Sequence, residues 1–197
     1  MRILTVDSIM GFNPCENYSR ERVINLFGER KEVSLKETLL TQEIPYDDRI
    51  WLARKALPSA DNHMIWRLWG IACAEIVLHI YEKKFPNDLR PRKAIEAAKA
   101  FIDGKISEDE IEIARSAASA AYAYAADAAN SAAAANSAAA ANAAAYAVYA
   151  SAVAAAANAA SNAVYASANA AWSANAANDA LCGLQQQKNI RLLVDLL

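Results

Sequence analysis

An uncharged segment of 51 residues, 128–178, constrains the fold of this 197-residue chain more than any other feature. It lies inside a longer tract, residues 114–180, in which 39 of 67 residues are alanine. The uncharged segment contains no acid, base or nucleophile stronger than serine or tyrosine, which argues against a catalytic centre there. Side chains as small as alanine predict helices that pack very closely, with axes about 8 Å apart.

The alanine tract is too long to be one straight helix in a compact domain. Alanine is the best helix former, and the tract contains no glycine or proline. A single helix of this length would extend about 100 Å, whereas a compact domain of this size is about 40 Å across. We therefore expect the tract to fold back two or more times, although an extended rod is an alternative. Asparagine and serine compete with helix by bonding local backbone, and they supply candidate breaks at Asn130-Ser131, Asn136-Ser137 and Ser161-Asn162.

An internal repeat lies within the tract, where residues 147–162 align with residues 163–178. Sixteen residues do not return a helix to the same phase. The repeat is therefore either two helices joined near Ser161 or a sequence duplication without structural meaning. The few larger side chains should anchor the packing of the tract: Tyr122, Tyr146, Tyr149, Tyr165, Trp172, Val148, Val153 and Val164.

Residues 1–115 contain 18 of the 20 Lys and Arg residues and 19 of the 22 Asp and Glu residues. Asn17 or Ser19 can cap a helix over 20–27 that ends at Gly28, and Ser34 with Glu37 forms a capping box. Asp47 or Asp48 can cap the next helix. A helix over 60–84 is apolar almost all round, with one polar stripe of Arg67, Glu75, His79 and Glu82, so other helices should bury it.

Further helices are predicted from Pro91 to Asp103, with Gly104 as the stop, and from a second capping box, Ser107 with Glu110, into the tract. A last helix is predicted over 185–197. No run of alternating β-branched residues is present, so the fold class is all-α, an alanine-rich multi-helix bundle with closely packed helices. We expect a charged, tryptophan-containing half (1–115) and an alanine-rich half (116–197) in one continuous domain.

Several function classes are excluded by composition. The net charge of −2 offers no basic excess for nucleic acid. The three cysteines lack metal-ligand spacing, which predicts reduced structural thiols, and no phosphate-binding loop or nucleophile motif occurs. We therefore expect no catalytic residue, metal or cofactor. The uncharged segment contains eight Asn and six Ser, which argues against a membrane span, and without a signal-peptide pattern we expect a cytoplasmic protein.

The best candidate for partner recognition is the cluster of Asp88, Arg90, Arg92, Lys93 and Glu96, here named the 88–96 cluster. Arg92 and Glu96 are four residues apart and could instead pair on a solvated helix face. His79 and Glu75 should form an ordinary hydrogen bond on the polar stripe. Asp47 and Asp48 would bind a metal only with further ligands and are explained as helix caps.

The segment 85–106, FPNDLRPRKAIEAAKAFIDGKI, resembles the signature of the Imm-5-like family of immunity proteins. The matching positions are Pro86, Asp88, Arg90, Pro91, Arg92, Ala94, Ile95, Glu96, Ala97, Ala98, Gly104 and Ile106. The resemblance extends over about residues 45–180. It implies a non-enzymatic protein, of a bacterium or a phage, that neutralises a toxin or defence effector by direct protein–protein contact. Family members often place Arg and His among the alanines, where this chain has Asn, Ser and Tyr, so a surface of those charges would be absent.

Other functions stay open at this point. Alanine-rich helices also occur in ice-binding and structural proteins, although the only threonines, Thr5, Thr38 and Thr41, lie outside the tract. The 88–96 cluster with His79 could instead bind a small molecule. Alanine-rich helices pack well against copies of themselves, so we also expect a homo-oligomer.

Overall fold

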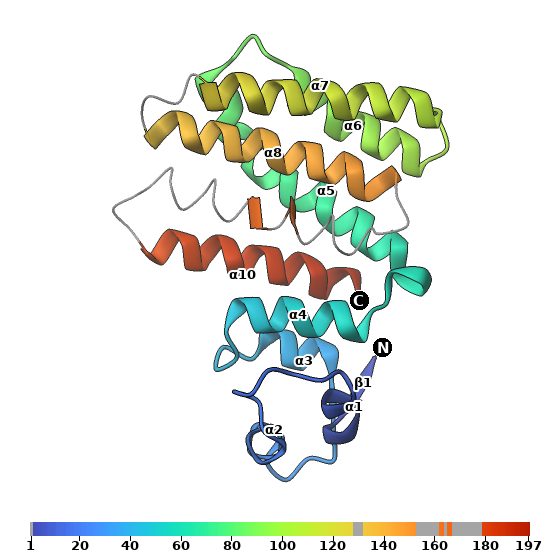
Figure 1. The fold of residues 1–197 in the computed structure, drawn as a ribbon, viewed down its shortest axis with the longest axis vertical. Coiled ribbons are helices and arrows are strands. Elements are labelled where there is room, and N and C mark those ends of the chain that lie inside the picture. Colours follow the sequence, from blue (N-terminus) through green and yellow to red (C-terminus); the bar gives the residue numbers. More distant parts are fainter. Residues whose placement is uncertain (1, 128–131, 153–161, 164, 167–178) are drawn as a thin grey trace. The chain divides into compact units, whose positions relative to one another are not determined.

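The structure, a computed structural model, describes residues 2–127, 132–152, 162–163, 165–166 and 179–197. Within these residues the chain forms nine helices and one sheet of two short strands, which confirms the mainly helical fold class. The chain divides into two compact units (Figure 1). The N-terminal unit comprises Met1–Pro58 with Leu197, and the C-terminal unit comprises Ser59–Leu196.

In the N-terminal unit, each of the two strands leads directly into a helix. Its elements are β1 (Ile3–Thr5), α1 (Val6–Gly11), α2 (Arg20–Phe27), β2 (Glu32–Ser34), α3 (Leu35–Leu40) and α4 (Tyr46–Ala56). β1 and β2 pair in antiparallel fashion, with Leu4 opposite Val33. Each strand has three residues, too few to show the alternation that predicts a strand from sequence.

Side-chain caps define where these helices begin. Ser34 accepts a hydrogen bond from the amide of Glu37 at 3.2 Å, and Glu37 accepts one from the amide of Ser34 at 2.8 Å. Ser19 caps α2, which ends at Gly28 with a φ of 61°. Both predicted caps are confirmed. The prediction that Asp47 or Asp48 caps α4 is wrong, because that helix begins at Tyr46, before either aspartate, and has no side-chain cap. Both carboxylates lie in its first turn, where the helix dipole favours negative charge.

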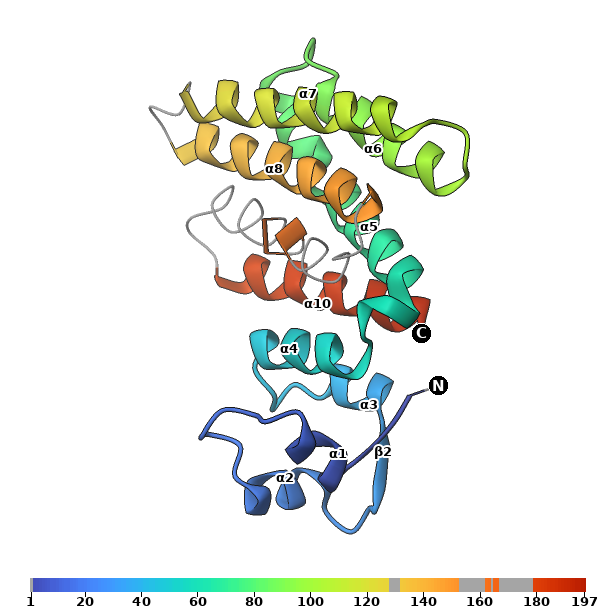
Figure 2. The ribbon, with the colours of Figure 1, turned by 45° about the vertical axis from the view of Figure 1, so that its right-hand side comes forward.

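The C-terminal unit consists of long helices. They are α5 (Ser59–Lys84), α6 (Arg90–Ile102), α7 (Glu108–Asp127), α8 (Ala132–Ala152) and α10 (Asp179–Leu196). α8 packs against α7, α5 and α6, and α10 packs against α5 (Figures 1 and 2). Asn62 has a non-helical backbone, with φ of −128° and ψ of 22°, so α5 is kinked near its start. The second predicted capping box, Ser107 with Glu110, precedes α7 as expected.

Alanine methyl groups form the contact between α7 and α8. Ala121 on α7 and Ala144 on α8 are fully buried, together with Tyr81 of α5 and Ile95 of α6. This arrangement confirms the close packing predicted from composition. Two of the expected anchors are wrong, because Tyr122 and Tyr149 are each 41% exposed. Val148 is buried, whereas Val153, Val164 and Trp172 lie outside the described residues.

The alanine tract folds back between α7 and α8, since α7 ends at Asp127, α8 begins at Ala132 and the two helices pack together. The predicted break at Asn130-Ser131 falls between them, outside the described residues. The predicted break at Asn136-Ser137 is wrong, because both residues lie inside α8, where tertiary packing outweighs their local preference. Ser161 and most of the 16-residue repeat lie outside the described residues.

The two tryptophans of α5 are fully buried. Their ring centroids lie 5.5 Å apart. The Trp69 indole N–H donates to the carbonyl oxygen of Asn189 on α10 at 2.7 Å, and the Gln185 amide donates to the Asn189 side chain at 2.9 Å. α10 is therefore held to α5 by a buried hydrogen bond as well as by apolar packing.

By length and composition, one helix among the described residues, Asp61–Lys84 within α5, could cross a membrane. Half of its most apolar window is buried inside the protein, and the core helix of a helical bundle passes the same test.

Candidate functional site

Asp88 lies in the turn between α5 and α6 and fixes two side chains with one carboxylate. It accepts a hydrogen bond from the Tyr81 hydroxyl at 2.5 Å. The Arg90 guanidinium donates to its two oxygens, with Nε at 2.9 Å from Oδ1 and Nη2 at 2.6 Å from Oδ2. The Arg90 backbone amide donates to Oδ1 at 3.1 Å. Tyr81, Asp88 and Arg90, here named the Asp88 network, therefore tie the end of α5 to the start of α6.

The charges in the Asp88 network reinforce each other. The hydrogen bonds from Arg90 hold the pKa of Asp88 well below its usual range, and the same bonds raise the pKa of Arg90. Burial, followed by the hydrogen bond to Asp88, raises the pKa of Tyr81. At neutral pH the network is therefore an ion pair with a protonated phenol that donates to the carboxylate.

The Asp88 network reaches the surface through aromatic rings. Phe85 packs between Tyr81 and Tyr124, with ring centroids 5.0 Å and 5.4 Å apart. The Arg90 guanidinium lies 5.8 Å from the centroid of the Tyr124 ring, within the range of a cation–π contact. Tyr124 is 55% exposed, so α7 presents an aromatic side chain that the turn at Asp88 supports from one side.

Among the other members of the 88–96 cluster, Arg92 has a partner on α5. Arg92 donates to both carboxylate oxygens of Glu82 on α5, at 2.6 and 2.7 Å, so it does not pair with Glu96 as it could have done. Lys93 and Glu96 are exposed on α6. The structure thus joins Asp88 with Arg90 and gives Arg92 a partner on another helix. A role of these five residues in recognition stays a prediction.

The expected hydrogen bond between His79 and Glu75 is absent from the described residues. His79 Nδ1 lies 2.9 Å from the carbonyl oxygen of Ile76, and Glu75 pairs with Lys99 of α6 at 2.5 Å. No three His, Cys, Asp or Glu side chains are grouped as metal ligands in the part of the chain that the structure describes. Cys73 is buried, and burial raises the pKa of its thiol.

The outward face of α7 is uncharged over three turns. Between Arg115 and Asp127 the helix carries no charged residue. Its exposed side chains include Ser116, Ser119, Ala120 and Ala123 at helical spacing, flanked by Tyr122 and Tyr124; these six residues are here named the α7 face. The neighbouring α6 instead exposes Arg92, Lys93, Glu96 and Lys99, as solvated helices commonly do.

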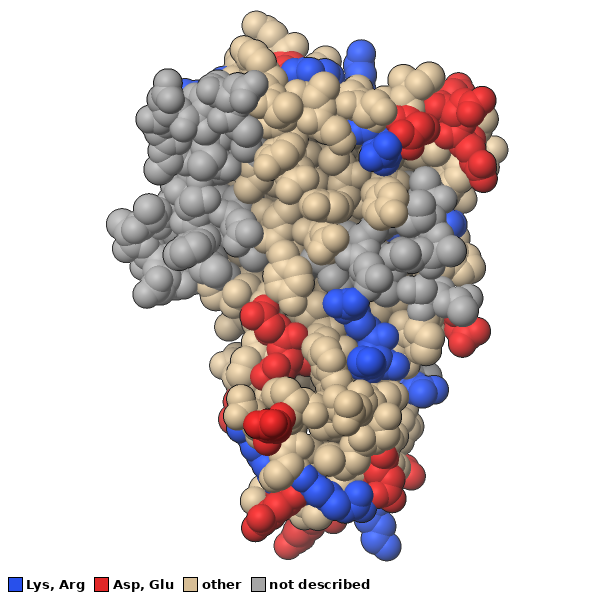
Figure 3. Space-filling view, viewed as in Figure 1, with Lys and Arg blue, Asp and Glu red and all other residues tan. Residues whose placement is uncertain are grey.

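Figure 3 shows the surface of the molecule on the side of α7 and α8. Red acidic side chains gather at the end of α7 that begins at Glu108, and the adjoining surface over α7 and α8 is tan. Sequence reasoning missed the α7 face because it assigned Tyr122 to the core. The available signal was the pair of tyrosines, Tyr122 and Tyr124, two residues apart on a helix, which cannot both point into the core of the bundle.

Fold and surface together define a class of protein, a closely packed α-helical bundle that exposes an uncharged, tyrosine-containing helix face. The family model described as Imm-5 like putative immunity protein matches residues 56–188, and the chain belongs to this family. The match confirms the resemblance seen in the sequence and includes the 88–96 cluster and the α7 face. No curated protein and no solved structure matches the chain.

Proposed function

We propose that this protein is a non-enzymatic inhibitor that neutralises a toxin or defence effector in the cytoplasm by direct contact. The α7 face together with Arg90 forms the contact surface. The observation that supports this proposal most strongly is the exposed face of α7, which lies in the middle of the family match. This face has no charged residue over three turns and has a tyrosine on either side.

The chemistry of the α7 face suits a protein partner. The centres of protein interfaces are depleted in charge and enriched in tyrosine and arginine, the residue types that most often dominate binding energy. Covering uncharged serine and alanine side chains requires no desolvation of an ion. A flat face of small side chains also lets a partner helix approach closely.

The Asp88 network supports this surface by holding Arg90 and Tyr124 in place. Arg90 is 37% exposed along its side chain and Tyr124 is 55% exposed. Because Asp88 already fixes the guanidinium, little rotamer freedom is lost when a partner covers it. In this proposal Asp88 positions the contact residues, Arg90 contacts the partner, and Arg92, Lys93 and Glu96 on α6 contribute to the polar rim.

The proposal is tested with the products of the genes that neighbour this one. Each is expressed alone and together with this chain, and growth is measured. A tagged copy of the chain then captures its partner from the protected cells. We expect one neighbouring product to be toxic, to be neutralised by the chain and to be captured with it. If no product is both toxic and neutralised, the proposal is wrong.

A charged residue introduced into the α7 face tests whether this face contacts the partner. Ala123→Glu keeps a good helix former at an exposed position and should weaken partner binding by about tenfold or more, because it buries an unpaired charge. Leu184→Glu on α10, where Leu184 is 50% exposed, is the matched control and should bind like the wild type. Full binding by the Ala123→Glu variant would exclude this surface.

A homo-oligomer stays a prediction. The alanine faces of α7 and α8 already pack together inside the C-terminal unit, and a second copy that used the outward α7 face would compete with the partner. Light scattering on purified wild-type protein and on the Ala123→Glu variant gives the stoichiometry of each.

A further inference from the structure

The N-terminal unit contains a pocket of about 290 Å³ that is independent of the surface proposed above. Its lining comes from α1, α2, β2, α3, α4 and the loops between them, all within residues 9–52. The family match begins at residue 56 and so leaves this pocket outside. The pocket is partly open to solvent, so a small molecule could enter it.

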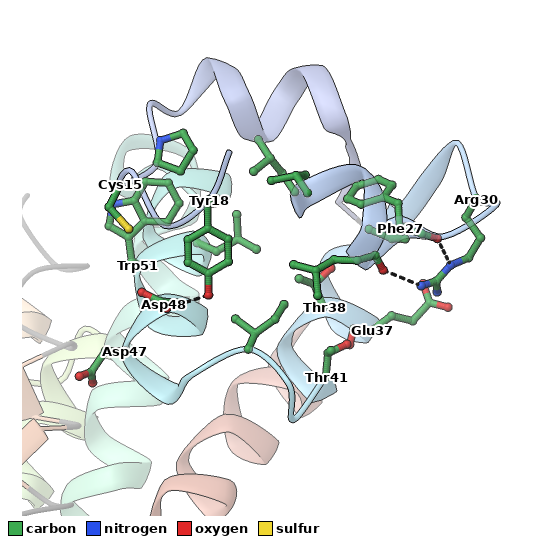
Figure 4. A pocket seen from close by; sticks show the side chains of 17 residues that line it. Cys15, Tyr18, Phe27, Arg30, Glu37, Thr38, Thr41, Asp47, Asp48 and Trp51 are labelled. Carbon is green, nitrogen blue, oxygen red and sulfur yellow. Dashed lines mark hydrogen bonds between the residues drawn. The ribbon is translucent and has the colours of Figure 1, made fainter. Parts of the chain in front are cut away.

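The floor of the pocket is apolar and buried. Val23, Phe27, Val33, Ile44 and Leu52 are between 2% and 7% exposed and contribute to it. Trp51 and Tyr18 are half-buried and add aromatic surface at one side (Figure 4). This combination of a large apolar floor with a few polar groups is typical of small-molecule sites, whose volumes begin at about 300 Å³.

The polar lining is predominantly acidic. Three carboxylates line the pocket, from Glu37, Asp47 and Asp48, against the one guanidinium of Arg30. Arg30 lies at the opposite side of the pocket from Asp47 and Asp48 (Figure 4). Its Nε donates to the carbonyl oxygen of Phe27 at 3.0 Å, which holds the guanidinium at the end of α2. Glu37 is likewise engaged, by Ser34.

Asp48 is held in a fixed position at the aromatic side. It accepts a hydrogen bond from the Tyr18 hydroxyl at 2.7 Å. Burial and this hydrogen bond raise the pKa of Tyr18 to about 12, so the phenol stays a donor at neutral pH. A carboxylate has room for several hydrogen-bond donors, and one phenol leaves Asp48 able to accept others. Asp47, one residue earlier and exposed, adds a second negative charge at the rim.

We infer that this pocket binds a small organic cation with an apolar body, such as an aromatic amine. The apolar body lies on the floor formed by Phe27, Ile44 and Leu52. The ammonium group lies at the side of Asp48 and Asp47, where the ring of Trp51 adds cation–π attraction. The Tyr18 ring already has the Arg22 guanidinium 4.7 Å from its centroid. An anion of the same shape is repelled by the two carboxylates at this side, and the guanidinium of Arg30 lies at the opposite side of the pocket.

The test uses two probes of similar shape and opposite charge, tryptamine and indole-3-propionate, titrated into the full-length protein at neutral pH. Binding is followed by heteronuclear NMR and calorimetry. We expect saturable one-to-one binding of tryptamine with shifts confined to residues 9–52, and binding of indole-3-propionate weaker by about tenfold or more. Equal binding of both probes, or no saturable binding of tryptamine up to millimolar concentration, overturns the inference.

Matched variants test whether Asp48 supplies the negative charge that binds the amine. Asp48→Asn keeps an oxygen that can accept from Tyr18 but removes the negative charge, and it should weaken tryptamine binding by about fivefold or more. Glu43→Gln removes an exposed carboxylate of the same unit that does not line the pocket and should leave binding unchanged. If both variants bind as the wild type, the inference is wrong. The Ala123→Glu variant should keep full tryptamine binding, which separates this inference from the proposed inhibitor function.

Discussion

The carboxylate of Asp88 accepts hydrogen bonds from three groups, and removing its charge should loosen the start of α6. We predict that Asp88→Asn lowers the free energy of unfolding by about 1–2 kcal/mol, since an amide can accept fewer of these bonds and cannot balance the guanidinium. The figure stays at the low end because water screens Arg90, which is 37% exposed. Urea unfolding followed by circular dichroism measures the change.

Arg92→Gln is the comparison for Asp88→Asn. It breaks the pair with Glu82 on the same two helices, but Arg92 is 48% exposed along its side chain, against 16% for Asp88. Exposed ion pairs contribute little to stability, so the loss should be clearly smaller than for Asp88→Asn. Equal losses for the two variants would show that the Asp88 network is not the stronger connection.

Stability that depends on Asp88 should also depend on pH. The folded protein holds the pKa of Asp88 below its value in the unfolded chain, which is about 4. Its contribution is therefore fully present above that unfolded value and is lost as the pH falls further. We predict that the stability gap between wild type and Asp88→Asn narrows from about pH 6 to about pH 2. A gap that stays constant over this range would contradict the prediction.

At the residue scale, sequence reasoning identified Asp88 and Arg90 but not the contact between them. Their role in binding a partner stays a prediction, and the structure adds that they bind each other. The reason is spatial, because Tyr124 lies on α7, far from Asp88 in sequence, and the packing of α7 against α6 brings it to the turn. A pattern within residues 88–96 contains no information about that neighbour.

At the scale of elements, the small side chain of alanine allows neighbouring helices to approach each other closely. Ala144 on α8 is fully buried. We predict that Ala144→Leu destabilises the protein by about 1–3 kcal/mol, because the added atoms must separate closely packed helices. Ala123→Leu, at an exposed position of α7, is the matched control and should change stability by no more than about 0.5 kcal/mol. Thermal and urea unfolding of both variants decide the comparison, and similar effects would refute close packing as the reason.

The contact between α5 and α10 makes a separate prediction. Trp69→Phe keeps an aromatic ring but removes the indole N–H that the Asn189 carbonyl accepts. We expect a loss of about 1–3 kcal/mol, because a buried carbonyl is left without that donor. Amide hydrogen exchange should accelerate in α10 before it does so in α7 and α8. Uniform acceleration over all helices would show that α10 does not depend on this bond.

Capping boxes were the most reliable sequence signals for elements, since Ser34 with Glu37 and Ser107 with Glu110 act over four residues and need no knowledge of the fold. Breaks in the alanine tract were less predictable. Asn136 and Ser137 have side chains that compete with helix by bonding local backbone, yet they continue α8. Whether a helix continues through such residues depends on which of its faces can pack against α5 and α7, and single residues do not determine this.

At the scale of the whole molecule, the division into two units suggests different origins for their stability. The core of the C-terminal unit is formed by residues between Ile71 and Ala166, all within that unit. The N-terminal unit has fewer than 60 residues, near the size at which a single core is marginal. The sequence suggested two halves of different composition that meet near residue 115 within one continuous domain. Composition marks the start of the alanine residues, whereas the units follow the contacts that α5 makes with α8.

We therefore predict that residues 59–196 fold without the N-terminal unit. The isolated fragment should be strongly helical and should unfold cooperatively, because α5, α6, α7 and α8 bury their apolar faces against one another. It should also capture the same partner as the full chain and fail to bind tryptamine, since the family match lies almost entirely within it and the pocket lies outside it. Circular dichroism during heating, light scattering and the two binding measurements test these expectations on one preparation. A fragment that is unfolded or aggregated would show that the alanine-packed helices need residues 1–58 to fold. Tryptamine binding by a folded fragment would show that the amine site lies in the C-terminal unit.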